Sequence, residues 1–301
     1  MKRILVTGAA GQIGSELTTV LRQKYGKDQV IASGLKTDTN EKLMNSGPFE
    51  YVDCTDFAQL KFAIQKYKVD TIYHLAAILS GVAEAKPQLA CEFNCTVFNP
   101  SSIGVFGPGT PSNNTPQVTI QRPNTMYGVT KVTGELLCDY YYKRFKVETR
   151  GLRYPGIISN ETLPGGGTTD YAVEIYYEAI KNKSYTCILK EGTKLDMMYM
   201  PDALNGANKL METYSDKLKH RNAFNVSAMS FAPEDVYAEI KKHIPDFTMD
   251  YKIDPVRQSI ADSWPNSMDD SAARVEWGWN PRFNLSEMTK DMLNVLSKKL
   301  K

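Results

Sequence analysis

The stretch MKRILVTGAAGQIGSELTTVLRQ, residues 1–23, joins a short apolar run to three spaced glycines and then to a helical pattern. The run ILV at residues 4–6 is typical of a parallel strand that is buried on both faces. Gly8, Gly11 and Gly14 follow it, and apolar residues then recur at helical intervals. Strand, glycine turn and helix in this order predict a dinucleotide-binding fold.

Each of the three glycines has an expected task in such a fold. Gly8 allows the tight turn, Gly11 lets a pyrophosphate approach the backbone, and Gly14 lets the helix pack closely on the strand. The pyrophosphate would accept hydrogen bonds at the helix N-terminus, which also places Gln12 and Ile13 at the cofactor. A glycine-rich turn without a ligand is the alternative, but the surrounding strand and helix favour cofactor binding.

The second expected strand leaves the choice of cofactor open. It covers residues 30–33 (VIAS), and an acidic residue that binds the ribose of NAD usually follows such a strand. Gly34 stands at that place, whereas Asp38 is a later substitute and Lys36 would favour the 2′-phosphate of NADP. The residues alone therefore do not decide between NAD and NADP.

Composition and charge exclude several classes of function. Of the 301 residues, 42% are hydrophobic and 23% are charged, which is ordinary for a soluble globular protein. The net charge of +2 gives no electrostatic reason to expect nucleic acid or an anionic membrane as partner. No apolar run reaches the roughly 20 residues of a membrane span. Because Met1 runs almost directly into the first strand, we expect no targeting segment and a cytoplasmic or mitochondrial-matrix location.

The five cysteines give no sign of a disulfide framework or a metal site. Their number is odd, and only Cys91 and Cys95 have a spacing that could suit a metal. Because no second Cys or His pair lies nearby, we expect reduced thiols and no metal.

Strand-like and helix-like segments alternate over the first half of the chain, which predicts an α/β fold with a doubly wound parallel sheet of the Rossmann type. Further strands are expected at residues 50–52, 71–75, 96–98 and 147–152, and helices at residues 57–67 and 129–142. From about residue 155 glycine-rich loops and isolated helices follow. We therefore expect a dinucleotide-binding domain over residues 1–155. Residues 156–301 would mainly form a smaller substrate-binding lobe, with a possible return of the chain to the core sheet.

A tyrosine and a lysine stand four residues apart, so that a helix would present both on one face. The ammonium of Lys131 is expected to lower the pKa of Tyr127 from its usual value of about 10, so that the phenol can act as a base. Ser101 and Ser102 lie upstream at the expected end of a strand, where ligands bind in such sheets. A tyrosine and lysine that merely pack at a surface are the alternative reading of this spacing alone.

The glycine turn, the two serines and the tyrosine–lysine pair, in this order, resemble the extended short-chain dehydrogenases and reductases. The resemblance implies a catalytic triad of Ser102, Tyr127 and Lys131, with Ser101 the less favoured serine. It also implies further cofactor contacts, at the adenine, along the cofactor and beside the nicotinamide: Asp53, Cys54, Leu75, Ala76, Ala77, Tyr154 and Ile157.

That family includes nucleotide-sugar epimerases and dehydratases, which are the main alternative. Such enzymes usually carry an arginine that grips the substrate diphosphate, and Leu195 stands in its place before Asp196. A non-catalytic dinucleotide sensor is a further alternative, but such proteins typically lack the tyrosine or the lysine.

Several segments resemble the short-chain type of L-threonine 3-dehydrogenase. They are HLAAILS at residues 74–80, RYPGIIS at 153–159, PGGGTTDYA at 164–172, VSAMSF at 226–231 and SWP at 263–265. The resemblance implies NAD-dependent oxidation of L-threonine to 2-amino-3-oxobutyrate by a homodimer, with hydride transfer from Cβ to the nicotinamide. The residues it implies for the substrate are Ser80, Ser102, Tyr127, Thr168, Thr169 and Trp264.

The chain departs from these relatives at two places. The family usually has an aspartate where Gly34 stands. About four turns of a long helix are also missing between Leu79 and Cys95, which leaves barely enough chain for a parallel crossover. We hypothesise that a segment of the natural chain is absent from this stretch, at Ala90–Cys91 or a neighbouring junction.

Overall fold

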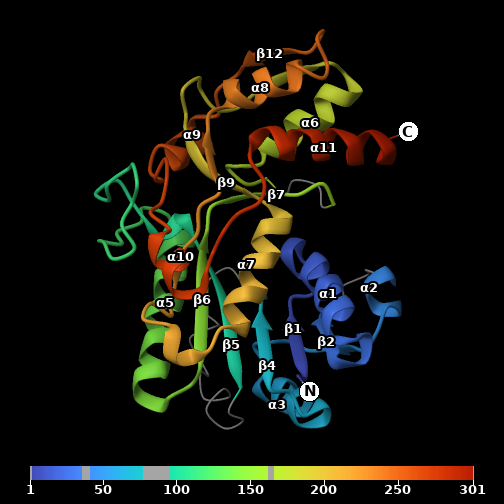
Figure 1. The fold of residues 1–301 in the computed structure, drawn as a ribbon, viewed down its shortest axis with the longest axis vertical. Coiled ribbons are helices and arrows are strands. Elements are labelled where there is room, and N and C mark those ends of the chain that lie inside the picture. The colour runs from blue at the N-terminus through green and yellow to red at the C-terminus, as the bar shows by residue number, and fades with distance from the viewer. Residues whose placement is uncertain (1, 36–40, 77–94, 162–165, 301) are drawn as a thin grey trace. The chain divides into compact units, whose positions relative to one another are not determined.

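The computed structural model describes residues 2–35, 41–76, 95–161 and 166–300. Its main element is a seven-stranded sheet with the strand order β10-β6-β5-β4-β1-β2-β3 (Figure 1). The pairs β1–β2, β1–β4, β2–β3 and β4–β5 are all parallel. The order reverses at β1 and β4, so that the sheet is doubly wound, and the predicted α/β Rossmann-type fold is confirmed.

The strands of this sheet are β1 (Ile4–Thr7), β2 (Val30–Gly34), β3 (Phe49–Tyr51), β4 (Thr71–His74), β5 (Thr96–Ser102), β6 (Thr149–Tyr154) and β10 (Phe224–Asn225). The helices along this part of the chain are α1 (Gln12–Tyr25), α2 (Glu41–Asn45), α3 (Phe57–Tyr67) and α5 (Met126–Phe145), with 3₁₀ turns η1 (Lys27–Gln29) and η2 (Ile103–Val105).

The chain divides into two compact units that are interleaved along the sequence. The first contains residues 1–101, 130–152 and 207–223, and the second contains residues 102–129, 153–206 and 224–301. The sequence predicts instead a single boundary at residue 155, with a possible return to the sheet.

Hydrogen bonds hold the returning segment in the first unit. The hydroxyl of Tyr73 on β4 donates to Asn208, at 3.3 Å. The guanidinium of Arg150 on β6 donates to the carbonyl oxygens of Leu210 and Thr213, both at 2.7 Å. Residues 207–223 therefore complete the first unit although they follow much of the second in sequence.

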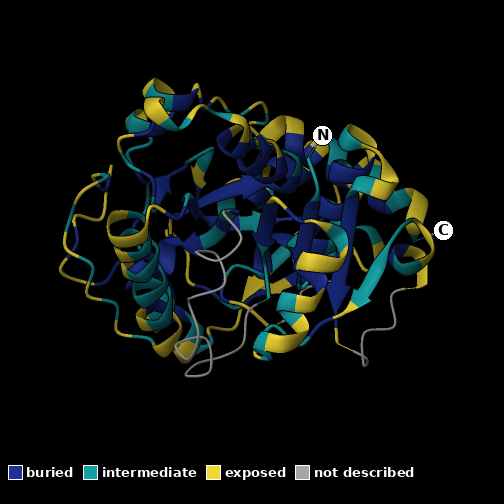
Figure 2. Ribbon diagram, turned by 90° about the horizontal axis from the view of Figure 1, so that it is seen from below, coloured by how far each residue is buried: buried dark blue, intermediate teal, exposed yellow. Residues whose placement is uncertain are grey.

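The strands at the centre of the sheet are apolar because both of their faces are covered. Every residue of β1 and β2 is buried, and Figure 2 shows the central strands as dark blue. A core cluster forms where α3 meets the sheet, from Leu5, Ile31, Ile64, Val69, Ile72 and Cys95. Asp56 caps α3 by accepting hydrogen bonds from the backbone N–H groups of Ala58 and Gln59. The rigid strand ends then provide fixed positions for the loops that follow them.

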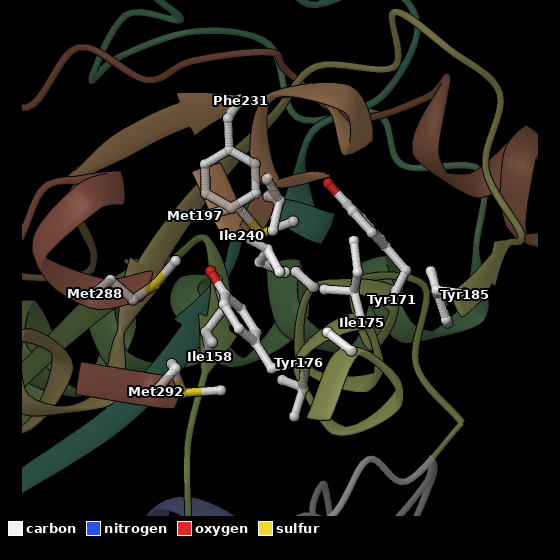
Figure 3. Packing of buried hydrophobic residues seen from close by; sticks show 14 of the residues in the cluster. Ile158, Tyr171, Ile175, Tyr176, Tyr185, Met197, Phe231, Ile240, Met288 and Met292 are labelled. Atoms are coloured by element: carbon white, nitrogen blue, oxygen red, sulfur yellow. The ribbon is translucent and has the colours of Figure 1, made fainter. Parts of the chain in front are cut away.

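The second unit has its own core between helices and a small sheet of order β11-β9-β7. Figure 3 shows Tyr176 of one helix packed near Met288 and Met292 of another, with Tyr171 in the same cluster beside Ile175. The strands here are β7 (Gly156–Ile158), β8 (Ser184–Cys187), β9 (Leu195–Tyr199), β11 (Met229–Phe231) and β12 (Thr248–Tyr251). The helices are α6 (Tyr171–Lys181), α7 (Met200–Glu212), α8 (Pro233–Lys241), α9 (Pro255–Ala261), α10 (Ser271–Trp277) and α11 (Leu285–Lys299), with the 3₁₀ turn η3 (Ser215–Lys217).

Within the part of the chain that the structure describes, no helix is both long enough and apolar enough to cross a membrane. Over the same residues, no group of three or more His, Cys, Asp or Glu side chains is arranged to hold a metal ion.

Candidate active site

The glycine turn after β1 is packed too closely for side chains at two of its positions. Gly8 has a φ of +66°, and a Cβ there would lie 2.6 Å from the backbone nitrogen of Ala76. A Cβ on Gly14 would lie 2.2 Å from the carbonyl oxygen of Gly8. A Cβ on the exposed Gly11 would come no closer than 3.3 Å to that oxygen. Gly8 and Gly14 are therefore required by the fold itself, whereas Gly11 keeps the outer side of the turn open.

The start of α1 fits the pyrophosphate of a dinucleotide. Gly11 is the N-cap, no side chain caps the helix, and the first turn contains no acidic residue. The helix dipole and free N–H groups therefore favour an anion at this place. Gln12 is exposed and Ile13 half-buried in the first turn, and the turn contacts Leu75–Ala76 through Gly8. Ala77, the next predicted cofactor contact, lies outside the described residues.

The strand ends beside this turn carry the predicted adenosine contacts. Val52 donates its backbone N–H to the carbonyl oxygen of Gly34, at 3.0 Å, which holds the two strand ends together. Asp53 follows, and its carboxylate accepts from the backbone N–H and the hydroxyl of Thr55, at 2.9 and 2.7 Å. Burial raises the pKa of Cys54, and the negative charge of Asp53 adds to the rise. Lys36 and Asp38 lie outside the described residues, so β2 ends in a glycine with no described acid directly after it.

Ser102 and Tyr127 meet where β5 ends and α5 begins. Ser102 ends β5, and its Oγ accepts a hydrogen bond from the backbone N–H of Gly104, at 3.1 Å. The ring of Tyr127 lies 3.1 Å from the point where a Cβ of Gly104 would be, and the Ser102 Oγ is 3.5 Å from the same point. The two hydroxyls share a hydrogen bond. The structure thus brings together two of the three predicted triad residues.

The acidity of Tyr127 differs from the sequence-based expectation. Burial raises the pKa of the phenol, and the hydrogen bond with Ser102 only partly opposes the rise. The residue as a whole is nevertheless 43% exposed, so the phenol is desolvated although Tyr127 is not enclosed by the protein. The expected lowering by Lys131 is therefore wrong, because desolvation of the phenolate dominates.

Lys131, the third predicted member, lies one helical turn after Tyr127 on α5. Its ammonium donates to the carbonyl oxygen of Pro100 on β5, at 2.9 Å. Burial lowers the pKa of Lys131, and the charge of Glu135 opposes this change. The charge of Lys131 also acts on His74 at the end of β4. Burial lowers the pKa of this imidazole, and the positive charge of Lys131 lowers it further. Its Nδ1 lies 2.8 Å from the hydroxyl oxygen of Thr7.

The two neighbouring serines have different partners. Ser101 is 3% exposed, and its hydroxyl donates to the carboxylate of Glu135, which is also 3% exposed. Ser102 instead bonds with Tyr127. Ser101 is thus already engaged by a carboxylate, and the assignment of Ser102 to the triad stays a prediction. Glu135 was missed by the sequence reasoning, although its position four residues after Lys131 could have indicated it.

The predicted substrate residues that can be described lie in the second unit with Ser102 and Tyr127. Thr168 is buried, and Thr169 packs against Gly156, whose Cβ would lie 2.7 Å from the Thr169 methyl carbon. Asp170 closes this loop, because its carboxylate accepts from the backbone N–H groups of Gly166 and Gly167, at 2.7 and 2.6 Å. The threonine loop is thereby fixed beside the segment predicted to contact the nicotinamide.

The remaining residues predicted to contact cofactor or substrate differ in their burial and in whether their polar groups already have a partner. Tyr154 is buried, and its hydroxyl donates to the carbonyl oxygen of Ala203, at 2.9 Å, so this group is already engaged. Ile157 is half-buried on β7. Trp264 is half-buried and packs against the core cluster of the second unit. Ser80 lies outside the described residues.

An open helix N-terminus after a parallel strand, together with paired serine and tyrosine hydroxyls and a half-buried lysine, defines the class of short-chain dehydrogenases and reductases. The sequence model of the NAD dependent epimerase/dehydratase family matches residues 4–90 and 87–227. The chain belongs to this family, which is of the extended type. Membership implies a nicotinamide cofactor, NAD or NADP.

Known relatives match over the whole chain. An uncharacterized epimerase/dehydratase of Staphylococcus saprophyticus is 50% identical over 100% of this chain and 99% of its own length. The X-ray structure of L-threonine dehydrogenase from Clostridium difficile has a TM-score of 0.94 at 57% identity, covering 99% of this chain and 98% of that chain. A monomeric L-threonine 3-dehydrogenase from a metagenome, in its apo form, gives 0.91 at 43% identity, covering 99% and 100%.

Two features of these comparisons bear on the helix expected to be missing. The alignment with the staphylococcal relative spans 316 positions, 15 more than the 301 residues of this chain. Fifteen residues correspond to about four turns of α-helix. The two stretches matched by the family model meet at residues 87–90, inside the interval from Leu79 to Cys95. The match to the family model is therefore interrupted inside the interval where a segment is predicted to be absent, and residues 77–94 lie outside the described part of the chain.

Proposed function

We propose that the protein is an NAD-dependent dehydrogenase that oxidises the β-hydroxyl group of L-threonine to give 2-amino-3-oxobutyrate. One observation carries the proposal: the hydrogen-bonded pair of Ser102 and Tyr127 occurs in a chain that matches an L-threonine dehydrogenase over 99% of its length. The two hydroxyl groups can bind and deprotonate a secondary alcohol, and the similarity to an L-threonine dehydrogenase is the reason for proposing L-threonine as that alcohol.

The chemistry follows from the groups at this site. Ser102 binds the substrate hydroxyl, and the Tyr127 phenolate takes its proton while the O–H and the Cβ–H bonds break and a carbonyl group forms. Oxidised nicotinamide, when bound, supplies the acceptor for the hydride that leaves Cβ. Lys131 binds the ribose beside it and favours the phenolate through its positive charge. Thr168 and Thr169 offer hydroxyl groups to the amino-acid end of the substrate.

A nucleotide-sugar substrate fits the second unit less well. Leu195, at the place of the diphosphate-binding arginine of such enzymes, is 1% exposed and pairs with Phe231 between β9 and β11. A buried leucine offers no charge-assisted hydrogen bond to a diphosphate, whereas an arginine would offer two. The family's epimerases and dehydratases therefore remain the alternative that the experiment must exclude.

We further propose NAD as the cofactor and the cytoplasm as the location. NAD rests on the likeness to L-threonine dehydrogenases, against the missing acid at Gly34. The cytoplasm rests on the staphylococcal relative, which comes from a bacterium and so from a cell without mitochondria.

The test is to mix the protein with NAD and L-threonine and to follow the absorbance of the reduced nicotinamide. Turnover with L-threonine is expected, together with formation of 2-amino-3-oxobutyrate. D-threonine and L-serine serve as controls for stereochemistry and for the β-methyl group. Conversion of a nucleotide-sugar, with no reduction of NAD by L-threonine, would contradict the proposal.

A further inference from the structure

Two neighbouring residues of helix α5 reverse the usual pattern, in which charged side chains are exposed and apolar side chains are buried. Glu135 is 3% exposed, while its neighbour Leu136 is 61% exposed. Isolated carboxylates are almost never fully buried without a partner, since desolvation of the charge is costly. A buried carboxylate in this position therefore calls for a functional or structural reason.

Two adjacent residues of β5 hold a pair of opposite charges on α5. The hydroxyl of Ser101 donates to the carboxylate of Glu135, and the carbonyl oxygen of Pro100 accepts from the ammonium of Lys131, at 2.9 Å. Glu135 follows Lys131 by four residues, so the two side chains lie on the same face of the helix. We propose that Glu135, oriented by Ser101, is a positioning residue that keeps the ammonium of Lys131 charged and in place. The inference rests on the proposed function, since Lys131 is assigned there to the phenolate and the cofactor ribose.

Among the described residues, Glu135 is the group whose negative charge acts to raise the pKa of Lys131. His74 faces it from β4, and its lowered pKa keeps the imidazole neutral near pH 7, so it adds no opposing charge there. Pro100 supplies only a carbonyl dipole from β5. Burial acts to remove the proton from Lys131, and Glu135 acts to retain it. A neutral amine could not favour the phenolate of Tyr127, so this balance decides whether the site functions near neutral pH.

The main experiment measures the pKa of Lys131 directly. Trace labelling with acetic anhydride at a series of pH values, read by mass spectrometry of the peptide that contains Lys131, gives this pKa without substrate or cofactor. In Glu135→Gln, which keeps the shape and removes the charge, we expect the pKa to fall by about one unit or more. Asp139→Asn removes the same charge one turn further along α5 and is expected to shift it by less than about 0.3. An unchanged Lys131 pKa in Glu135→Gln would overturn the inference.

A second variant tests the part played by the hydroxyl. Ser101→Ala keeps both charges and removes only the donor that orients the carboxylate. We expect kcat to fall several-fold with little change in KM, and a kcat equal to that of the unmodified protein would contradict the positioning role. If Glu135→Gln does not fold, as judged by circular dichroism, the same labelling of Ser101→Ala decides the matter, with a lowered pKa of Lys131 as the expected result and an unchanged pKa as the result that overturns the inference. Because the labelling needs no substrate, a failure to oxidise L-threonine leaves its outcome intact and would refute only the proposed function.

Discussion

At the scale of single residues, Tyr127 is the group whose removal should affect chemistry without affecting binding. Tyr127→Phe keeps the ring and removes the proton acceptor, so kcat with L-threonine is expected to fall by roughly 10²–10⁴-fold while NAD binding stays nearly intact. Because burial raises the pKa of this phenol, kcat of the unmodified protein should rise from pH 7 to pH 9 as the phenolate forms. Steady-state kinetics over this pH range and a cofactor fluorescence titration measure both effects.

The exposed Tyr214, 76% accessible, provides the control for this substitution. Tyr214→Phe should leave both kcat and its pH dependence unchanged. If Tyr127→Phe retained more than about half of the turnover of the unmodified protein, the assignment of Tyr127 as the base would be wrong.

The residue at position 34 is expected to affect the choice between NAD and NADP. We expect NAD to be preferred over NADP in the unmodified protein. Gly34→Asp should then tighten NAD by about 1.5–3 kcal/mol, the range for a hydrogen bond to a charged group, through the ribose hydroxyls. The same carboxylate should weaken NADP by repelling its 2′-phosphate. Fluorescence titrations with NADH and NADPH measure both changes, and a higher kcat/KM with NADP in the unmodified protein would contradict the first expectation.

At the scale of elements, β9 contains an acid whose burial affects stability. Asp196 is 1% exposed and accepts from the Ser227 hydroxyl and the Met268 backbone N–H, both at 2.9 Å. Burial nevertheless raises its pKa from 3.8 to about 7. Between these two values the folded protein holds a proton that the unfolded chain has lost. This group therefore stabilises the fold most at low pH, and its contribution is lost as the pH rises towards 7, by up to about 1.4 kcal/mol per unit.

Asp196→Asn should remove this dependence. From pH 5 to pH 7 the unfolding free energy of the variant should rise relative to that of the unmodified protein, because only the unmodified protein loses the contribution of protonated Asp196. Above pH 7 the difference between the two should stay constant. Urea unfolding at several pH values measures it. Equal slopes for Asp196→Asn and the unmodified protein would show that Asp196 keeps an ordinary pKa in the fold.

The elements of the parallel sheet could largely be predicted from the sequence. The helix expected at residues 57–67 coincides with α3 (Phe57–Tyr67), because its apolar spacing and the cap at Asp56 mark both ends. The helix expected at residues 129–142 extends further, over Met126–Phe145. The strands of the second unit, β7 to β12, were not predicted. They are no shorter than most strands of the main sheet, but they do not alternate regularly with helices, which is the pattern that predicted the sheet.

The candidate site could be predicted where function depends on spacing along one element. The glycines and the Tyr127–Lys131 pair are of this kind. The bond between Ser101 and Glu135 joins residues 34 positions apart, so no local pattern reveals it. The raised pKa of Tyr127 was missed for a related reason, since burial of the phenol is decided by packing that the sequence does not show.

At the scale of the whole molecule, the outer side of α5 predicts self-association. Leu136 and Tyr140 are 61% and 53% exposed there, and the rings of Tyr140, Tyr141 and Phe145 pack against one another. Burying such a surface gains about 25 cal/mol per Å² of apolar area. We therefore expect a homodimer through α5, although one similar protein is described as monomeric.

Light scattering at micromolar concentration measures the oligomeric state. Leu136→Glu together with Tyr140→Glu should give a monomer with an unchanged circular dichroism spectrum. The matched control is Lys143→Glu, on the exposed end of the same helix, which should leave the dimer intact. A stable monomer of the unmodified protein would contradict the prediction.

The interleaving of the two units also affects how the protein is made in the cell. The first unit needs residues 207–223, and two of the three segments of the second unit precede them in the chain. A ribosome that adds about 5–20 residues per second takes roughly 10–45 seconds to reach that point. During this time the apolar strands β1 and β2 have been synthesised but their unit is incomplete. The newborn chain therefore passes through a long interval in which aggregation competes with folding.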